Sequence, residues 1–224
     1  GVRLAQWTPD GTAGPWAGFL DGAAGVVNLA GESIAAGRWS SMQKARLRES
    51  RIDATRSLLA GLAACATPPG AFVSGSAVGY YGTRGDEPLT ENSPAGSDFL
   101  AALCVEWEAI ARQAAAYSRR VVVVRTGLVL DREGGALPRM AAPFRFYVGG
   151  PIGSGSQYVS WIHIDDWVAL VTWAIADPSV SGPINATARS GITRWPPRSS
   201  ASAISPSSAR SAMAGAGNHA GRSS

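Results

Sequence analysis

Residues 71–82 have the sequence AFVSGSAVGYYG and are the most informative part of the chain. They begin as an apolar run typical of a buried strand and end in a glycine-rich turn. A polar loop follows over residues 83–96, and then an amphipathic helix over about residues 98–117. In open α/β sheets, ligands bind outside the carboxyl ends of the strands. We therefore expect Ser76, which stands just past such a strand end, to mark a binding site.

Further short apolar runs predict the other strands of the fold. They lie at residues 26–31, 121–124, 160–164 and 183–187, with one more at residues 2–7. Helices are expected over residues 41–64, 137–144 and 167–176, the last of them capped by Asp165. The buried stripe of the first helix is predicted to hold Met42, Ala45, Ile52, Leu59 and Leu62. Because apolar strands alternate with helices, the sequence predicts an α/β fold around a parallel sheet.

The end of the chain differs in kind from the rest. Residues 189–224 include ten serines, five arginines and no acidic residue, and they show no hydrophobic periodicity. We expect this tail to be disordered, because it cannot bury enough apolar surface to offset chain entropy. The abrupt change of composition suggests a shifted reading frame. Without the tail, 15 basic and 16 acidic residues remain, and this near-neutral body argues against a nucleic-acid partner.

Several other classes of protein are excluded by composition. No apolar run reaches the roughly 18–20 residues that a membrane-spanning helix needs, so no membrane partner is expected. Two cysteines, Cys65 and Cys104, are too few for a disulfide framework and indicate a reducing, cytoplasmic compartment. The two histidines, His163 and His219, lack metal-ligand spacing, so no metal site is predicted.

A series of short motifs over about residues 2–188 resembles one family in order and spacing. The motifs are VVNLAGE (26–32), SR (50–51), SGSAVGYYG (74–82), FLA (99–101), WE (107–108), RTG (125–127), GSG (153–155), SWIHIDD (160–166) and GPINAT (182–187). Together they resemble the extended short-chain dehydrogenase/reductases, and within them the atypical, sugar-nucleotide epimerase-like "epimerase family protein" branch.

This resemblance implies a Rossmann-like parallel sheet flanked by helices. Residues 1–188 would form a partial NAD(P)-binding domain with the beginnings of a small substrate lobe, and residues 189–224 a low-complexity tail. The family's Gly-x-x-Gly-x-x-Gly phosphate loop does not occur in the chain. We expect it before Gly1, which would make the sheet incomplete at its N-terminal end and this chain a fragment.

The resemblance also implies a cofactor site at the strand ends. The four residues expected to lie along the cofactor are Asn28, Leu29, Ala30 and Gly31. Arg51 would meet a cofactor phosphate, and Val129 would touch the cofactor through its backbone. Because a guanidinium group suits the extra phosphate of NADP, NADP is favoured over NAD.

The catalytic residues of the family are only partly matched. Ser76 stands where the family has its catalytic serine, with stabilisation of its own turn as the alternative role. The family's Tyr-x-x-x-Lys pair falls on Leu100 and Cys104, so the ammonium group that activates a tyrosine of pKa ~10 is missing. Tyr80 is the candidate substitute acid, although Tyr80 and Tyr81 could both be core aromatics.

Three functions remain open on this basis. The first is an NADP-binding epimerase or oxidoreductase that acts on a sugar nucleotide or a similar small molecule. The second is a non-catalytic NADP-binding module that senses redox state, which the apolar pair Leu100 and Cys104 favours. The third is a fragment without function of its own.

Overall fold

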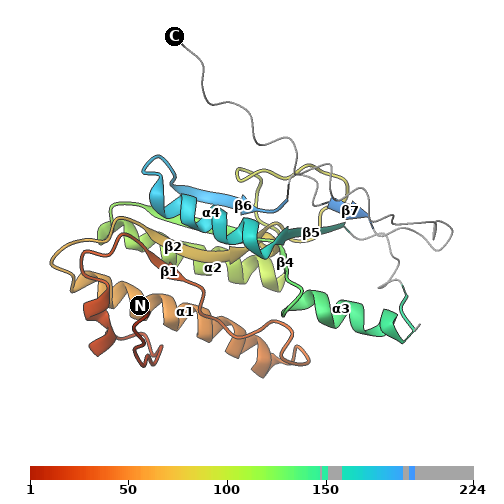
Figure 1. Cartoon of the computed structure of the whole chain (residues 1–224), viewed down its shortest axis with the longest axis horizontal. Helices are drawn as coiled ribbons and strands as arrows, with labels where there is room; N and C mark the ends of the chain where they lie inside the picture. Colours follow the sequence, from red (N-terminus) through yellow and green to blue (C-terminus); the bar gives the residue numbers. More distant parts are fainter. Residues whose placement is uncertain (147, 151–157, 189–191, 195–224) are drawn as a thin grey trace, which may run out of the picture. The chain divides into compact units, whose positions relative to one another are not determined.

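The computed structural model describes residues 1–146, 148–150, 158–188 and 192–194 (Figure 1). The chain divides into two compact units, of which one comprises Gly1–Gly149 with Val159–Thr193. The other unit, Gly150–Tyr158 with Arg194–Ser224, lies almost wholly outside the described residues. The GSG motif and nearly all of the tail predicted to be disordered also lie outside them.

Four strands form the central sheet in the order β1-β2-β3-β6, and every neighbouring pair is parallel. Their bounds are Val26–Asn28 (β1), Phe72–Ala77 (β2), Val121–Thr126 (β3) and Gly182–Ala186 (β6). All four carboxyl ends therefore lie at the same edge of the sheet. The predicted α/β fold with a parallel sheet is confirmed.

Helices cover both faces of this sheet (Figure 1). On one face, α1 (Ser41–Ala63) and α2 (Phe99–Arg112) form a hydrophobic core with Phe72. On the other face, α4 (Ile164–Ala176) packs in a second core with Val73 and Val122. Since alternate residues of a strand face opposite sides, β2 and β3 serve both cores, which explains why their sequences are continuously apolar. The arrangement is Rossmann-like.

Shorter elements complete the described structure. They are the 3₁₀ helices η1 (Pro15–Phe19), η2 (Val78–Tyr81) and η3 (Gln113–Ala116), the helix α3 (Ala136–Arg145), and the strands β4 (Leu128–Leu130), β5 (Tyr158–His163) and β7 (Ile192–Arg194). The last three form a second sheet in the order β4-β5-β7, with β4 and β5 parallel. None of the described helices is both long and apolar enough to cross a bilayer.

The first two predicted strands differ from the structure. Residues 2–7 form no strand, and Val2 and Leu4 are almost fully exposed, while Trp7 packs against Trp16 with ring centroids 5.4 Å apart. The strand predicted over residues 26–31 ends at Asn28. The Asn28 side chain accepts a hydrogen bond from the Ala30 N–H, a local turn that takes the backbone out of the strand.

The predicted cap of α4, Asp165, is wrong. The helix begins at Ile164, and the ring nitrogen Nδ1 of His163 accepts a hydrogen bond from the Asp165 N–H at 3.2 Å. Asp165 and Asp166 lie in the first turn instead. Their negative charges are favourable there because the helix dipole is positive at its N-terminus.

The helix α1 starts as predicted, with the Ser40 hydroxyl accepting a hydrogen bond from the Gln43 N–H. Its predicted stripe fails at that end, because Met42 is 64% exposed and Ala45 is also exposed. At 23 residues α1 is about 34 Å long, whereas the six residues of β2 span about 20 Å. The helix is therefore longer than the strands it packs against, and Met42 in its first turn is exposed, although Leu47 in the next turn is fully buried.

The two ends of α1 provide a test of this packing. Replacing Leu62, which is buried in the first core, with alanine should lower the free energy of unfolding by about 2–5 kcal/mol through lost contacts and a cavity. The matched variant Met42→Ala should change it by no more than about 0.5 kcal/mol, because the side chain is exposed. Urea denaturation of both variants measures the difference, and equal losses would contradict the assigned core.

Candidate functional site

Three polar residues lie side by side on neighbouring strands of the central sheet. Ser76 of β2 is in register with Arg125 of β3, which is in register with Asn185 of β6. Register partners in a sheet point to the same face, here the face that α2 covers. Each stands one residue before the last residue of its strand. The candidate site is thus built at the carboxyl edge of the sheet, but Ser76 lies inside β2 and not, as the sequence predicted, just past its end.

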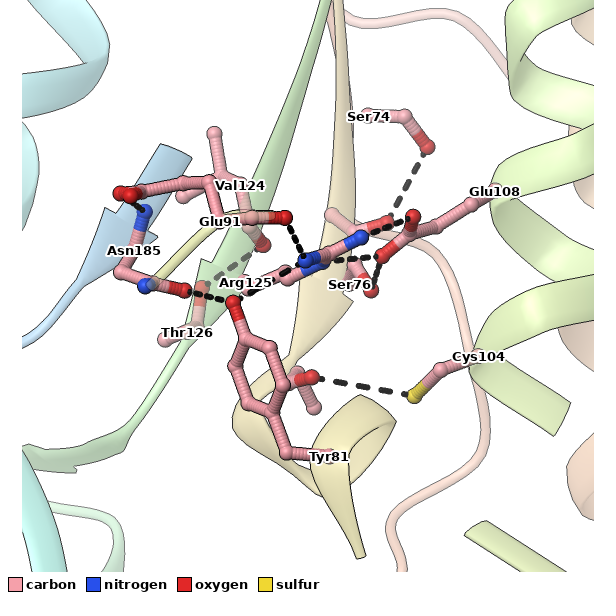
Figure 2. Close-up of polar contacts among 12 residues, drawn as sticks. Ser74, Ser76, Tyr81, Glu91, Cys104, Glu108, Val124, Arg125, Thr126 and Asn185 are labelled. Carbon is pink, nitrogen blue, oxygen red and sulfur yellow. Dashed lines mark hydrogen bonds and ion pairs between the residues drawn. The ribbon is translucent and has the colours of Figure 1, made fainter. Parts of the chain in front are cut away.

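The carboxylate of Glu108, on α2, meets two of these residues in a fully buried position (Figure 2). Its Oε1 accepts hydrogen bonds from Ser76 Oγ at 2.8 Å and from Arg125 Nε at 2.8 Å. Its Oε2 accepts from Arg125 Nη2 at 2.9 Å and from Arg112 Nη2 at 2.6 Å. Four donors therefore match the four acceptor positions of a carboxylate, which leaves the buried charge fully hydrogen-bonded.

Arg125 is the partner of Glu108 and is only 2% exposed. The two form a bidentate ion pair, and the remaining Nη1 donates to Tyr81 Oη and to the Glu91 carbonyl, both at 3.0 Å (Figure 2). Burial alone would lower the pKa of Arg125. The hydrogen bonds to Glu108 and Tyr81 outweigh it, so the pKa lies above its ordinary value. The guanidinium is therefore permanently charged.

Two tyrosines of η2 pack around this guanidinium. The ring of Tyr80 lies over it, with its centroid 3.5 Å from the Arg125 Cζ, and meets the ring of Tyr81 edge-on at 5.3 Å. The Tyr81 hydroxyl donates to Asn185 Oδ1 at 2.6 Å. Tyr80 is half-buried, whereas Tyr81 is buried. The stacking fixes the orientation of the Tyr80 ring.

The polar loop after η2 is fastened to the same cluster. Glu91 accepts a hydrogen bond from Arg125 through its carbonyl and one from the Asn185 N–H through its carboxylate, at 2.9 Å. The two ends of the loop meet, because the Gly96 N–H donates to the Tyr80 carbonyl and a side chain on Gly96 would overlap Gly82. One loop residue thus contacts both β3 and β6.

Leu100 and Cys104 stand at the two helix positions where the resembled family has its tyrosine and lysine. Leu100 lies against Gly79 of η2. Cys104 is buried, with its Sγ 3.9 Å from the Ala77 carbonyl oxygen. Burial raises the pKa of the Cys104 thiol, so the group stays neutral. Neither residue supplies the cation that the family's mechanism requires.

The end of β1 holds the first predicted cofactor residues. The side chain of Asn28 is occupied inside the protein, since its Nδ2 donates to Thr55 Oγ1 at 2.9 Å and its Oδ1 accepts from Ala30 N–H. Beyond it, Leu29 is 56% exposed and Gly31 is also exposed. Asn28 therefore shapes the turn, and the residues after it present the accessible surface.

Arg51 of α1 lies directly beside this turn. Its Nη1 donates to the Leu47 carbonyl at 2.9 Å and its Nη2 to the Glu32 carbonyl at 3.0 Å. A side chain on Gly31 would come within 3.0 Å of the guanidinium, so glycine permits the close approach. Burial lowers the pKa of Arg51, and within the described ranges no carboxylate forms an ion pair with it.

Trp107 connects the two groups of predicted residues. Its ring lies 5.4 Å from the Arg51 Cζ, its Nε1 donates to Thr55 Oγ1 at 3.0 Å, and it would contact any side chain on Gly75. Val129, by contrast, packs in the second core and pairs with Ile162 of β5. The structure thus gathers Ser76, Tyr80, Gly31 and Arg51 around α2, while Val129 lies against the core on the α4 side.

Sequence reasoning missed the residues that hold this site together. The sequence motifs contain Glu108 and Arg125, but they indicate no role for either residue. A signal was present, because Arg125 directly follows the four buried valines 121–124 and Glu108 lies one helical turn after Cys104 on the buried stripe. Opposite charges at two buried positions predict a pair. Among the residues that the structure describes, no cluster of metal-ligating side chains occurs.

Comparisons of the sequence with known proteins agree on one family. The sequence model described as "NAD dependent epimerase/dehydratase family" matches residues 14–186. The chain is 44% identical over 189 residues to the epimerase family protein Mb2239 of Mycobacterium bovis, which covers 84% of this chain and 62% of that protein. It is 44% identical over 175 residues to the chloroplastic SDR39U1 homologue of Arabidopsis thaliana, covering 77% and 50%. The chain thus spans about half to three fifths of such relatives.

Two solved structures share both fold and sequence. The human epimerase family protein SDR39U1, crystallised with NADPH, superposes with a TM-score of 0.72 at 39% identity, over 77% of this chain and 59% of that one. A nucleoside-diphosphate sugar epimerase from Corynebacterium glutamicum gives a TM-score of 0.72 at 39% identity, over 85% and 39%.

Glu108 and Glu106 form a matched pair for testing the buried cluster. Both lie on α2 and both pair with an arginine, but Glu108 is buried and Glu106 pairs with Arg48 at the surface. Glu108→Gln should lower the free energy of unfolding by about 3–5 kcal/mol, because it leaves buried guanidinium donors without a counter-charge. Glu106→Gln should cost far less. Denaturant titration checks the pair, and similar losses would show that the cluster is not rigidly buried.

Proposed function

The chain belongs to the NAD dependent epimerase/dehydratase family, and we propose that it binds NADP at the carboxyl edge of its sheet and acts on a sugar nucleotide or a similar small molecule. Family membership agrees with the resemblance inferred from the motifs. The observation that carries the proposal is the position of Arg51, a half-buried guanidinium beside the end of β1.

Arg51 fits a phosphate group. A guanidinium has five N–H donors, and the described hydrogen bonds of Arg51 occupy only two nitrogen atoms with neutral carbonyl acceptors. No carboxylate in the described part of the chain forms an ion pair with it, and the charge of Glu32 acts on it only from a longer distance. An additional phosphate, which NADP has and NAD lacks, would supply the missing charge. The human relative crystallised with NADPH supports the same choice.

The turn after β1 fits the body of a nucleotide. Asn28 holds this turn through its side chain, so Leu29, Ala30 and Gly31 are presented in a defined shape. Gly31 has no side chain to obstruct a flat ligand. Val129, in the strand that follows β3, is proposed as a backbone contact by analogy with the family.

A bound nicotinamide would supply hydride exchange. The chain's own residues would position the substrate beside it, with Ser76 contributing a hydroxyl. We assign the proton-transfer role to Tyr80, because its ring is fixed over Arg125 and its hydroxyl makes no hydrogen bond among the described residues. Tyr81 is unsuited to this role, since its hydroxyl is buried between Arg125 and Asn185.

A non-catalytic NADP-binding module is the second candidate function. The observation that favours it is the replacement of the family's tyrosine and lysine by Leu100 and Cys104, neither of which supplies the activating cation. Such a module would keep the Arg51 site and would bind the cofactor without turning it over.

The choice of cofactor can be tested at Arg51. Arg51→Gln should weaken NADPH binding about tenfold or more while changing NADH binding little, because only NADPH carries the additional phosphate. Fluorescence titration of both nucleotides gives the two dissociation constants. Arg56→Gln, on the same helix but paired with Asp53 at the surface, serves as control. An unchanged ratio of NADPH to NADH affinity in Arg51→Gln would refute the assignment.

Turnover separates the enzyme from the binding module. We expect the chain to oxidise or reduce its cofactor with at least one member of a panel of sugar nucleotides, and Tyr80→Phe to lower that rate at least about a hundredfold. Loss of NADPH absorbance follows a net reduction, and NMR of the sugar follows an epimerisation, which regenerates the cofactor and leaves the product mass unchanged. NADPH that binds tightly while neither the cofactor nor the sugar changes would favour the second candidate.

A further inference from the structure

The hydroxyl of Ser76 has a fixed direction, which limits what it can bind. We propose that Ser76 acts only as a hydrogen-bond acceptor toward a ligand, so that the group bound there is a donor such as a hydroxyl or a carboxamide NH₂, not a ketone oxygen. This inference rests on the proposed function, because the ligand is taken to be the nucleotide cofactor or the sugar nucleotide.

The Ser76 hydroxyl has a single hydrogen, and the direction of that hydrogen decides what a ligand meets. A serine hydroxyl has one hydrogen to donate and two lone pairs that accept. The Ser76 Oγ lies 2.8 Å from Glu108 Oε1, and an ionised carboxylate only accepts. The single hydrogen of Ser76 must therefore point toward Glu108. A ligand approaching Ser76 from the carboxyl edge meets lone pairs.

The charged state of Glu108 secures this direction. The bidentate pair with Arg125 and the additional contact from Arg112 place two guanidinium groups on one carboxylate. Protonating Glu108 would remove the acceptor from these charge-assisted hydrogen bonds. A relay that passes a substrate proton through Ser76 to Glu108 is therefore disfavoured. Glu108 and Arg125 are positioning residues that act through Ser76.

No other described group would turn the Ser76 hydroxyl hydrogen away from Glu108. Cys104 lies within reach of both the Ala77 carbonyl and the Ser76 hydroxyl, and a thiol hydrogen directed to either acceptor leaves the Ser76 hydrogen on Glu108. Arg125 contacts Glu108, Tyr81 and Glu91 with its donors and does not hydrogen-bond Ser76 in the described structure. Ser76 is 6% exposed, so only a small part of its surface faces a ligand. With its hydrogen held by Glu108, Oγ has only lone pairs left to offer a ligand.

Two ligand groups fit this chemistry, and the test separates them. In the first arm, the affinity for NADP is compared with that for its acetylpyridine analogue, in which a methyl group replaces the carboxamide NH₂. In the second arm, UDP-glucose is compared with a UDP-sugar that has a ketone in place of one ring hydroxyl. Calorimetric titration measures each pair for the unmodified chain and for Ser76→Ala.

We expect the unmodified chain to prefer the donor-bearing ligand about tenfold in one arm, and Ser76→Ala to abolish that preference in the same arm. The arm that responds identifies the group beside Ser76. The matched control is Ser74→Ala, two residues earlier on the same face of β2, whose hydroxyl donates to the Gly75 carbonyl. It should keep the preference. If Ser76→Ala does not fold, Ser76→Cys provides a weaker acceptor of similar size.

The remaining outcomes overturn the inference. A preference for the ketone that disappears in Ser76→Ala would show that Ser76 donates. A preference that Ser76→Ala leaves unchanged, or no preference in either arm, would show that Ser76 does not hydrogen-bond the group that differs between the two ligands. If the unmodified chain binds none of the four nucleotides, the proposed function itself fails, and this inference fails with it.

Discussion

The ion pair between Glu108 and Arg125 is the interaction on which the carboxyl edge of the sheet depends. Burying two charges is unfavourable unless geometry is good and every remaining donor and acceptor is satisfied. Here the carboxylate receives four hydrogen bonds and the guanidinium reaches Tyr81 and the Glu91 carbonyl. Satisfying the pair thus requires α2, β2, β3, η2 and the following loop to be in place together.

The sheet could be predicted from sequence because its strands obey a local rule. Runs such as the four valines of β3 are apolar at every position, which is expected when helices cover both faces. Where local patterns are weak, prediction failed. The sequence near Met42 does not show that α1 is longer than the strands of the sheet, so the exposure of Met42 was not predicted. The helix α4 begins earlier than its polar residues suggest, and it is therefore capped by His163 and not by Asp165.

The candidate site was predictable in outline and not in its connections. A serine near the end of a strand and an arginine in the helix that follows a glycine turn are visible in the sequence. The roles of their neighbours arise from long-range contacts, such as Thr55 joining Asn28 to Trp107 or Asn185 meeting Tyr81. These pairs are separated by tens of residues, and no spacing rule connects them. The assignments of Ser76, Tyr80, Arg51 and Val129 to ligand contacts remain proposals.

The loop between Gly82 and Gly96 has a consequence for how this surface could change in evolution. Since its two ends touch, the length of the loop is independent of the distance between β2 and α2. Lengthening such a closed loop costs little entropy. Insertions on either side of Glu91 could therefore reshape the rim of the site freely. The side chain of Glu91 is the exception, because its carboxylate accepts from the Asn185 N–H, whereas its bond from Arg125 uses a backbone carbonyl that any residue would supply.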